Sequence, residues 1–438
     1  DHLGIYGYRR DTSPALAAFA RESLLFTAAR SQAACTFPSV NSILTSRFPS
    51  AFMGQSGGAM GLPAGIPGVA EILRGKGFHT VAISASPVVR KSPTRFNPGG
   101  GYDRGFEVFD EQCLWQPADC VTRQALPHLR RGARPLLLYL HYLDPHGPYA
   151  LPPRYPHRFA TGTPRKDFIR RGDPNPIANH LYKGGPDPGV TAADIEYLVD
   201  LYDDKIAFFD SQLARLLRAV RASGLLDESI VVFAADHGEE FLEHGHVKHC
   251  RTLFDTSVHT PLLVRLPGVG GGAPLTAPVQ NLDIVPTLLD YLGIAKGGLP
   301  LAGHSLRPLI EGERGHWDRA GSRDEGGGRG GEGERAGNVG GARHPGPSFQ
   351  FASQGALRSV SDGRWKLIQN LASHRFALFD LAADPGERRD CAAAHRPELH
   401  RLRQALDEWL ARTEGTAAAG ALRSTEADRK LRSVGYLD

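Results

Sequence analysis

The sequence lacks long apolar runs, and this absence excludes one class of protein. Its 438 residues hold no apolar stretch of about 18 residues, the length that a membrane-spanning helix needs. It also lacks arginine or lysine runs interleaved with aromatic residues, and 51 basic against 47 acidic side chains leave a net charge of only +4. We therefore expect no membrane span in the given chain and no nucleic-acid partner.

Cysteine is scarce, and its spacing excludes two kinds of stabilised small domain. The five cysteines are an odd number at irregular spacings, so neither a disulfide framework nor a zinc-binding pattern is visible. Cys113 and Cys120 lie close enough in the sequence to pair in an oxidising compartment. The sequence itself leaves the compartment open.

Apolar residues make up 41% of the chain, while 51 glycines and 32 prolines indicate that part of it is not packed. That part is residues 311–347, where glycine, arginine and glutamate dominate; such a segment cannot offset its ordering entropy and is predicted to be a disordered insert. We expect a main α/β domain over residues 1–310, a C-terminal subdomain over 348–412 and a loose tail over 413–438.

Periodicity supplies the expected elements of the α/β domain. Apolar runs of β-forming residues predict buried strands at 135–140 and 230–235. Thr191 and Asp194 form a capping pair at the start of the longest helix, which carries one apolar stripe and ends at Gly224. Helices are also predicted over 13–30 and from Pro38, and residues 155–190 are expected to form a long surface loop.

Chemically active side chains follow both predicted strands. Asp236 and His237 come directly after residues 230–235, with His249 about a dozen residues later, and His146 lies in a proline-rigid loop after residues 135–140. Ligands collect at the carboxyl ends of strands in open α/β sheets, and adjacent oxygen and nitrogen donors suit a divalent cation. His141, His244 and His246 fit structural roles better than direct contact with a metal or substrate.

Thr36 lies just before the helix expected from Pro38. The free amide groups of a helix start attract an anion, which would place the threonine hydroxyl beside a bound anion. The alternative is a threonine N-cap with no chemical role.

Eight short motifs in sequence order now carry a resemblance. They are Asp1 to Gly7, Pro38-Ser39 with Leu44-Thr45, His141 with Asp144-Pro145-His146, Asp236 to Glu240 with Glu243-His244 and His249, Asp283 to Thr287, Gly303 to Leu306, Asp362 to Leu367, and Leu378 to Glu387. On these motifs the chain resembles the sulfatase family of the alkaline phosphatase superfamily over nearly its whole length.

The resemblance implies an alkaline-phosphatase-like α/β sandwich around a mostly parallel central sheet, with a small C-terminal antiparallel sheet and helix. It implies a divalent metal, Ca²⁺ by preference with Zn²⁺ or Mn²⁺ as alternatives, held by Asp236 and His237. His146 and His249 would contact the anionic oxygens or the leaving group of an ester, and Lys248 would bind the substrate as an extra cation. A periplasmic or secreted location would suit the family.

Two departures from the family pattern shape the prediction. Sulfatases carry a cysteine that matures to formylglycine two residues before the proline; here that position is Thr36, Cys35 lies one residue too early, and Val40 replaces an arginine. We therefore expect an unmodified Thr36 and no formylglycine. The first strand of the family, which brings one or two aspartates to the metal, is missing before Asp1, so the chain is expected to be an N-terminally truncated fragment whose metal site is incomplete.

The sequence thus predicts a metal-dependent, sulfatase-like hydrolase of sulfate or phosphate esters with Thr36 as its nucleophile. A formylglycine hydrate can eliminate its sulfate, whereas a threonine ester must be cleaved by a second attack, which favours phosphate chemistry modestly. The alternative is a catalytically inactive sulfatase-like protein that binds an anionic ligand in the same cleft. The physiological substrate stays open.

Overall fold

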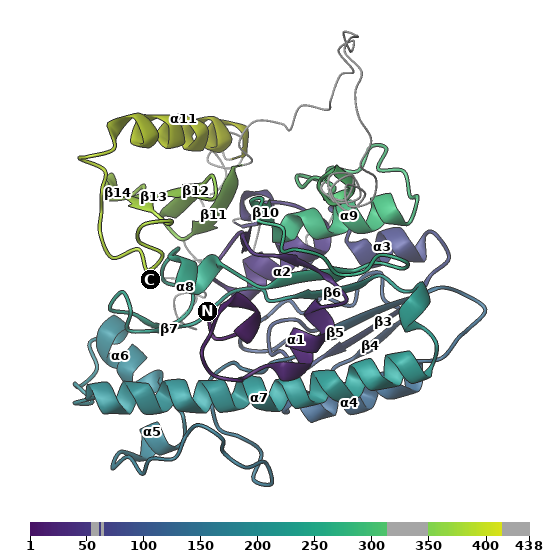
Figure 1. The fold of residues 1–438 in the computed structure, drawn as a ribbon, viewed down its shortest axis with the longest axis horizontal. Helices are drawn as coiled ribbons and strands as arrows, with labels where there is room; N and C mark the ends of the chain where they lie inside the picture. The colour runs from purple at the N-terminus through teal and green to yellow at the C-terminus, as the bar shows by residue number, and fades with distance from the viewer. Residues whose placement is uncertain (54–60, 63–64, 313–348, 414–438) are drawn as a thin grey trace, which may run out of the picture.

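The protein has three layers, with helices on both sides of β-strands, and a smaller unit beside them (Figure 1). This computed structural model describes residues 1–53, 61–62, 65–312 and 349–413. The predicted insert beyond residue 312 and the predicted tail beyond residue 413 lie outside the described residues. No helix in the described ranges is long and apolar enough to cross a membrane.

The central strands form two three-stranded sheets. In one sheet β3 pairs in parallel with β4 and β5; in the other β9 pairs antiparallel with β1 and β6. The strands are β1 (Leu24–Phe26), β3 (His79–Ser84), β4 (Val108–Asp110), β5 (Leu136–His141), β6 (Val231–Ala234) and β9 (Leu262–Arg265). Smaller pairs are β2 (Ala29–Arg30) with β10 (Val279–Gln280) and β7 (Glu240–Phe241) with β8 (Val247–Lys248).

Helices cover the strands on both faces. The two layers are α1 (Pro14–Ala20), α4 (Ala118–Ala125) and α7 (Ala192–Ala222) on one side, and α2 (Thr36–Thr45), α3 (Val69–Arg74) and α9 (Ile284–Tyr291) on the other (Figure 1). Shorter helices are α5 (Asp167–Arg170), α6 (Asn175–Lys183) and α8 (Asp255–Val258). Short 3-10 helices lie at Gly4–Tyr6, Pro49–Ala51, Leu126–His128, Leu226–Glu228 and Asn281–Asp283.

The long helix α7 begins and ends as its sequence predicts. Thr191 and Asp194 form a reciprocal capping box, in which the Asp194 carboxylate accepts from the Thr191 amide at 2.8 Å. Gly224 follows the helix with a positive φ of 70°. Further along, the carboxylate of Asp210 accepts from the amides of Ala15 and Leu16, each at 2.8 Å. This carboxylate satisfies free amides in the first turn of α1 and so ties α1 to α7.

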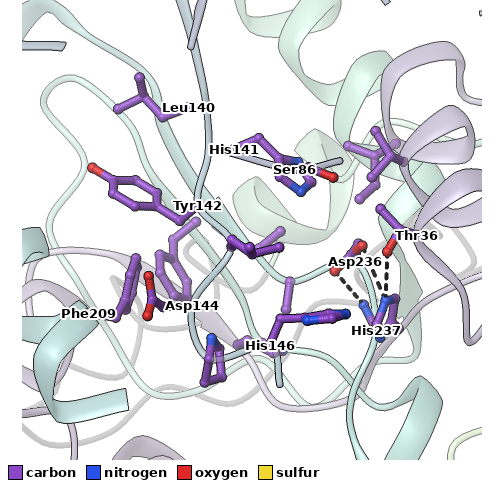
Figure 2. Close-up of a pocket in the computed structure, with 18 of the residues that line it drawn as sticks. Thr36, Ser86, Leu140, His141, Tyr142, Asp144, His146, Phe209, Asp236 and His237 are labelled. Carbon is purple, nitrogen blue, oxygen red and sulfur yellow. Dashed lines mark hydrogen bonds and ion pairs between the residues drawn. The ribbon is translucent and has the colours of Figure 1, made fainter. Parts of the chain in front are cut away.

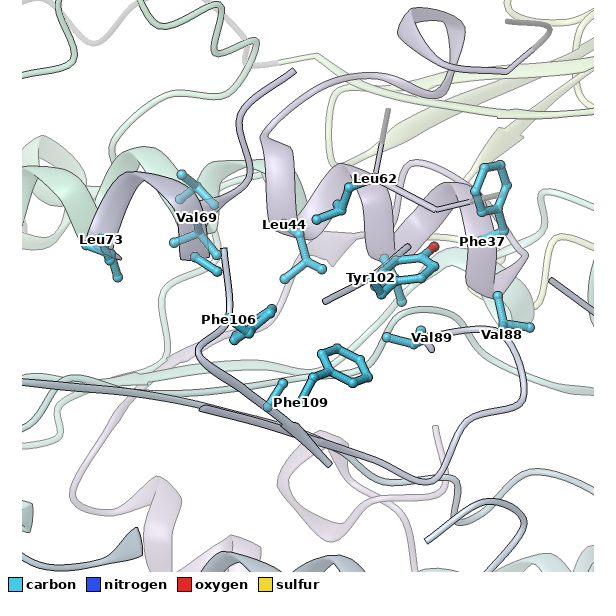
Figure 3. Packing of buried hydrophobic residues seen from close by; sticks show 14 of the residues in the cluster. Phe37, Leu44, Leu62, Val69, Leu73, Val88, Val89, Tyr102, Phe106 and Phe109 are labelled. Atoms are coloured by element: carbon cyan, nitrogen blue, oxygen red, sulfur yellow. The ribbon is translucent and has the colours of Figure 1, made fainter. Parts of the chain in front are cut away.

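A compact apolar core joins α2 and α3 to the neighbouring strands (Figure 3). Phe37 and Leu44 enter it from α2, and Leu73 enters it from α3. Phe106 meets Phe109 edge to face with ring centroids 5.8 Å apart. The packing fixes the position of α2, the helix that begins at Thr36.

An apolar cavity of about 1500 Å³ opens between β5 and β6 and reaches Thr36 and Asp236. Among the described residues, β5 and β6 are edge strands of their two sheets. Their apolar side chains were predicted to be buried, yet every residue of both strands is only half-buried. The reason is that these side chains line the cavity instead of packing against a neighbouring strand.

Two local predictions are wrong. The helix expected over residues 13–30 ends at Ala20, because Leu24 to Phe26 is a fully buried apolar run that pairs with β9 as β1. The loop expected over 155–190 contains α5 and α6; the latter packs Ile177 against the apolar face of α7. In both places tertiary packing outweighs the local pattern.

The smaller unit is a four-stranded antiparallel sheet covered by one helix (Figure 1). Its elements are β11 (Gln350–Gln354), β12 (Leu357–Ser361), β13 (Trp365–Asn370), β14 (Arg375–Asp380) and α11 (Arg396–Thr413). Trp409 of α11 stacks on Phe351 of β11 with ring centroids 5.0 Å apart. The small C-terminal antiparallel sheet and helix that the resemblance implies are confirmed.

Buried charges connect this unit to the main domain. The Lys366 ammonium, 1% exposed, lies 2.6 Å from an Asp255 oxygen and 2.9 Å from a Glu387 oxygen. Arg30 approaches Asp255 from the other side, with a nitrogen-to-oxygen distance of 2.6 Å. Burial alone would raise the pKa of Asp255, but the charges of Arg30 and Lys366 outweigh it and hold this pKa well below its ordinary value.

We expect Lys366→Met to destabilise the protein strongly. The substitution keeps the length of the side chain but leaves the Asp255 and Glu387 carboxylates buried with less cationic charge, and breaking a buried ion pair costs about 3–5 kcal/mol. The free energy of unfolding, measured in urea, should fall by that amount. Arg364→Met is the matched control, because Arg364 pairs with Asp380 at the surface; equal losses in both variants would contradict the argument.

Candidate active site

The first turn of α2 meets the residues that follow β6. Cys35 is the N-cap residue of α2 and Thr36 is its first helical residue, so the N-cap alternative for Thr36 is wrong. The Ser39 hydroxyl donates to the carbonyl of Asp236 at 2.6 Å. This bond holds the start of the helix against the end of the strand, because Asp236 lies two residues beyond β6.

Thr36 and His237 are in direct contact (Figure 2). His237 Nδ1 lies 2.9 Å from the carbonyl oxygen of Gly238, which can only accept, so Nδ1 carries the proton of the neutral ring. His237 Nε2 is then an acceptor, and the Thr36 hydroxyl donates to it at 3.1 Å. The proton that a nucleophilic threonine must lose therefore already points at a base.

Asp236 adds a carboxylate to the same point. Its Oδ2 lies 3.5 Å from His237 Nε2, so a carboxylate oxygen, an imidazole nitrogen and the Thr36 hydroxyl converge. The carbonyl contact that fixes the tautomer of His237 is the arrangement that metal-binding histidines commonly have. Within the described part of the chain, however, no group of three or more His, Cys, Asp or Glu side chains has the geometry to hold a metal ion. The residues fit a metal as an incomplete donor set.

Two further histidines face this point. His249 stacks obliquely beside His237, with ring centroids 4.3 Å apart, and the His146 ring lies 5.1 Å beyond His249. His249 Nδ1 donates to Glu239 at 3.1 Å, and His146 Nδ1 donates to the carbonyl of Gly147. In both neutral rings Nε2 is therefore left as an acceptor.

Burial sets the charge of these groups. It lowers the pKa of His146 to about 3, with the charge of His249 acting in the same direction, and it lowers the pKa of His249 well below its ordinary value. For Asp236 burial would raise the pKa, but the nearby imidazoles, His237 first, outweigh it and lower the pKa. Near neutral pH Asp236 is therefore ionised, whereas the rings of His146 and His249 are neutral.

A disulfide fastens the two halves of the site together. Cys35 and Cys250 are bonded, with their Cα atoms 4.7 Å apart, and the Cys250 amide donates to the Ala34 carbonyl at 2.8 Å. Cys35 precedes Thr36 and Cys250 follows His249, so the bond fixes the positions of both candidate residues at once. Lys248 and Cys250 have positive φ angles of 68° and 71°, and this strained backbone presents His249 to the site.

The structure gathers most of the residues singled out in the sequence. Thr36, Asp236, His237, His146 and His249 line the cavity between β5 and β6. Lys248 also lines it, and its ammonium donates to Asn175 at 2.9 Å.

The remaining histidines make other contacts. His141 Nδ1 lies 2.9 Å from the Tyr139 hydroxyl. The His141 ring also helps to lower the pKa of Asp236. His244 stacks on Phe254 and His246 stacks on Tyr182.

Sequence reasoning missed two contributors to the site. Glu239 orients His249; its place directly after Asp236-His237-Gly238 was the available signal. The Cys35–Cys250 bond had no local signal, because its cysteines are 215 residues apart. The suggested pairing of Cys113 with Cys120 is present.

A sequence model of the sulfatase family matches residues 1–294. The chain belongs to the sulfatase family. Arylsulfatase K of Danio rerio is 38% identical over 120 residues, which are 27% of this chain and 23% of that protein. Choline-sulfatase of Rhizobium meliloti is 25% identical over 308 residues, 68% of this chain and 54% of the relative. The matched parts are thus less than two thirds of these sulfatases.

Solved structures show the same fold at low sequence identity. A protein solved in complex with its substrate D-glucosamine-2-N,6-O-disulfate is 18% identical, with a TM-score of 0.69 over 94% of this chain and 95% of that one. The phosphonate monoester hydrolase of Agrobacterium radiobacter is 20% identical, with a TM-score of 0.67 over 98% and 95% of the two chains. The predicted alkaline-phosphatase-like fold with its C-terminal sheet and helix is confirmed.

We predict that the native protein contains one free thiol. Two disulfides account for four of the five cysteines and leave Cys391. The protein denatured without reductant should take up one equivalent of a thiol-alkylating reagent, and five after reduction. Peptide mass spectrometry should place the single label on Cys391. Labelling of Cys35 and Cys250 in the unreduced protein would contradict the cross-link.

Proposed function

We propose that this sulfatase-family chain is a metal-dependent hydrolase of sulfate or phosphate esters in which Thr36 is the nucleophile. The observation that carries the proposal is the contact between the Thr36 hydroxyl and His237 Nε2, beside the ionised Asp236. A hydroxyl at the first residue of a helix also faces free backbone amides, which favour an anionic ester.

The metal is proposed to be held by Asp236 Oδ2 and His237 Nε2, where it would polarise the ester and stabilise the threonine as an alkoxide. The resemblance favours calcium, a carboxylate ligand suits calcium or manganese, and an imidazole ligand suits zinc, so all three ions are candidates. We infer that a β-strand fills the cavity between β5 and β6 and that its carboxyl end adds acidic ligands. The support is that Asp1 and Asp236 line this cavity and that both flanking strands are sheet edges.

The proposed reaction has two displacements. Thr36 Oγ1 gives up its proton to solvent, because Nε2 of His237 would be occupied as a metal ligand, and attacks sulfur or phosphorus while the bond to the leaving oxygen breaks on the opposite side. His146 and His249 are neutral before the ester binds; an anionic ester favours their protonated forms, which can then donate at Nε2 to its oxygens. The leaving oxygen takes its proton from one of these rings. Water then cleaves the threonine ester and restores the hydroxyl.

The threonine bears on the choice between the two kinds of ester. A threonine ester has no second hydroxyl on its carbon and so cannot eliminate its group as a formylglycine hydrate does. It must be cleaved by a second attack at sulfur or phosphorus, a route common in phosphoryl transfer. Phosphate esters are therefore the first substrates to test, with sulfate esters beside them.

One observation favours a second candidate function. Because the described residues lack a complete metal-binding group, the chain could bind an anionic ligand in the same cleft without turning it over. The hydrolase would bind a metal ion and turn over esters, whereas the second candidate would bind an anionic ligand without any turnover.

We expect Thr36→Ala to lower kcat/KM at least about a thousandfold toward aryl phosphate and aryl sulfate esters, because the atom that forms the covalent bond is removed. The assay uses the chain with Ca²⁺, Zn²⁺ or Mn²⁺ added. Thr45→Ala is the matched control, since Thr45 is a buried threonine in the last turn of the same helix. If activity survives in Thr36→Ala but is lost in Cys35→Ala, Thr36 is not the nucleophile.

We expect Asp236→Asn to weaken metal binding more than about a hundredfold, because a ligand has a larger effect on affinity than the residues that orient it. Calorimetric titration with each ion measures this, on the given chain and on a version extended before Asp1 by a strand that ends in aspartate. The extended version should bind more tightly. Asp227→Asn is the control, since Asp227 is exposed before β6. The proposal fails if neither version binds metal.

A further inference from the structure

Trp115 is an exposed aromatic residue at the same cavity as Thr36, and the proposed chemistry does not use it. Its side chain is 43% exposed, the highest value among the large apolar residues of the described chain. Its ring centroid lies 6.2 Å from His146 and 5.6 Å from Phe96. An exposed indole beside a functional histidine is a surface on which a ligand can lie.

The local backbone holds Trp115 in this position at a cost. Its φ is 58°, a left-handed conformation that a bulky residue rarely adopts. The Cys113–Cys120 disulfide closes the surrounding loop, and the Trp115 amide donates to the Ala85 carbonyl at 3.0 Å. Strain of this kind persists where the surroundings enforce it, and such positions cluster at ligand-binding sites.

The neighbours of Trp115 indicate which part of a substrate it meets. His146 separates it from His249, which in turn stacks beside His237 and the Thr36 hydroxyl. A group on Trp115 is therefore on the His146 side of the site, away from the attacking oxygen. In an in-line displacement the leaving group departs on the side opposite the attacking oxygen, which is the side of His146 and Trp115.

We propose that Trp115 is a specificity-determining residue that stacks against a ring in the leaving group of the ester. This inference rests on the proposed hydrolase function. The exposed indole is a flat apolar surface, and Phe96 supports it in a T-shaped contact at an interplanar angle of 72°. A flat indole fits a planar aromatic ring or the C–H face of a pyranose. The chain accordingly prefers esters of ring-bearing alcohols to esters of short alkyl alcohols.

The test compares three esters of one acid, either sulfuric or phosphoric acid. They are the 4-nitrophenyl ester, the 6-O-ester of glucopyranose and the ethyl ester. With the metal-loaded full chain, Trp115→Ala should raise KM for ring-bearing esters about tenfold, which corresponds to about 1.4 kcal/mol, with kcat little changed. KM for the ethyl ester should stay the same. An effect on only one of the two ring esters identifies whether the ring is aromatic or a sugar.

Two variants separate stacking from structural damage. Trp115→Phe keeps a flat ring and should restore most of the affinity for ring-bearing esters. Phe376→Ala removes another exposed aromatic, 36% exposed on β14, and should change none of the constants. The inference is overturned if Trp115→Ala alters KM for ethyl and ring-bearing esters by the same factor, or leaves both unchanged.

A binding measurement keeps the inference testable if no ester is hydrolysed. In that case the proposed hydrolase function fails, and calorimetry of 4-nitrophenyl sulfate and ethyl sulfate with the unaltered chain and Trp115→Ala still reports on stacking. Weaker binding of the aryl ester alone in the variant supports a ring-binding surface. Equal binding of both esters by both proteins overturns it.

Discussion

Three links between the first turn of α2 and residues 236–250 hold the candidate site together. Ser39 donates to the carbonyl of Asp236, Thr36 donates to His237, and Cys35 is bonded to Cys250. Each link joins one residue of the helix start to a different point of the segment that leaves β6. Because three separated points fix a rigid body, the threonine hydroxyl has little freedom to turn away from His237.

The C-terminal unit supports the same segment from behind. Asp255, five residues beyond Cys250, forms ion pairs with Arg30 and Lys366, and its amide donates to Glu387. This buried network crosses from the main domain to the antiparallel sheet. The four-stranded sheet therefore contributes to the position of His249 although none of its residues lines the cavity.

The sequence predicted the parts of the site that depend on local patterns. Asp236 and His237 follow an apolar β-forming run, and such a run must end where ligands gather in an α/β sheet, so their place was foreseeable. The Cys35–Cys250 bond was not, because nothing in either neighbourhood identifies a partner 215 residues away. The helix expected over residues 13–30 exists as α1 but was predicted too long, because the pairing of Leu24 to Phe26 with β9 is a long-range contact. The chemical roles of the gathered residues stay predictions.

The 215-residue separation of Cys35 and Cys250 also says when the site can form during folding. The two cysteines come together only after the strands and helices between them have found their places, because closing so long a loop is entropically costly until other contacts shorten it. The β3–β5 and β6–β9 pairings close much shorter loops, whereas the β1–β9 pairing closes a loop longer than the disulfide does. The neighbourhoods of Cys35 and Cys250 thus come together late, and a chain that folds but fails to oxidise would have a complete scaffold around a loosely assembled centre.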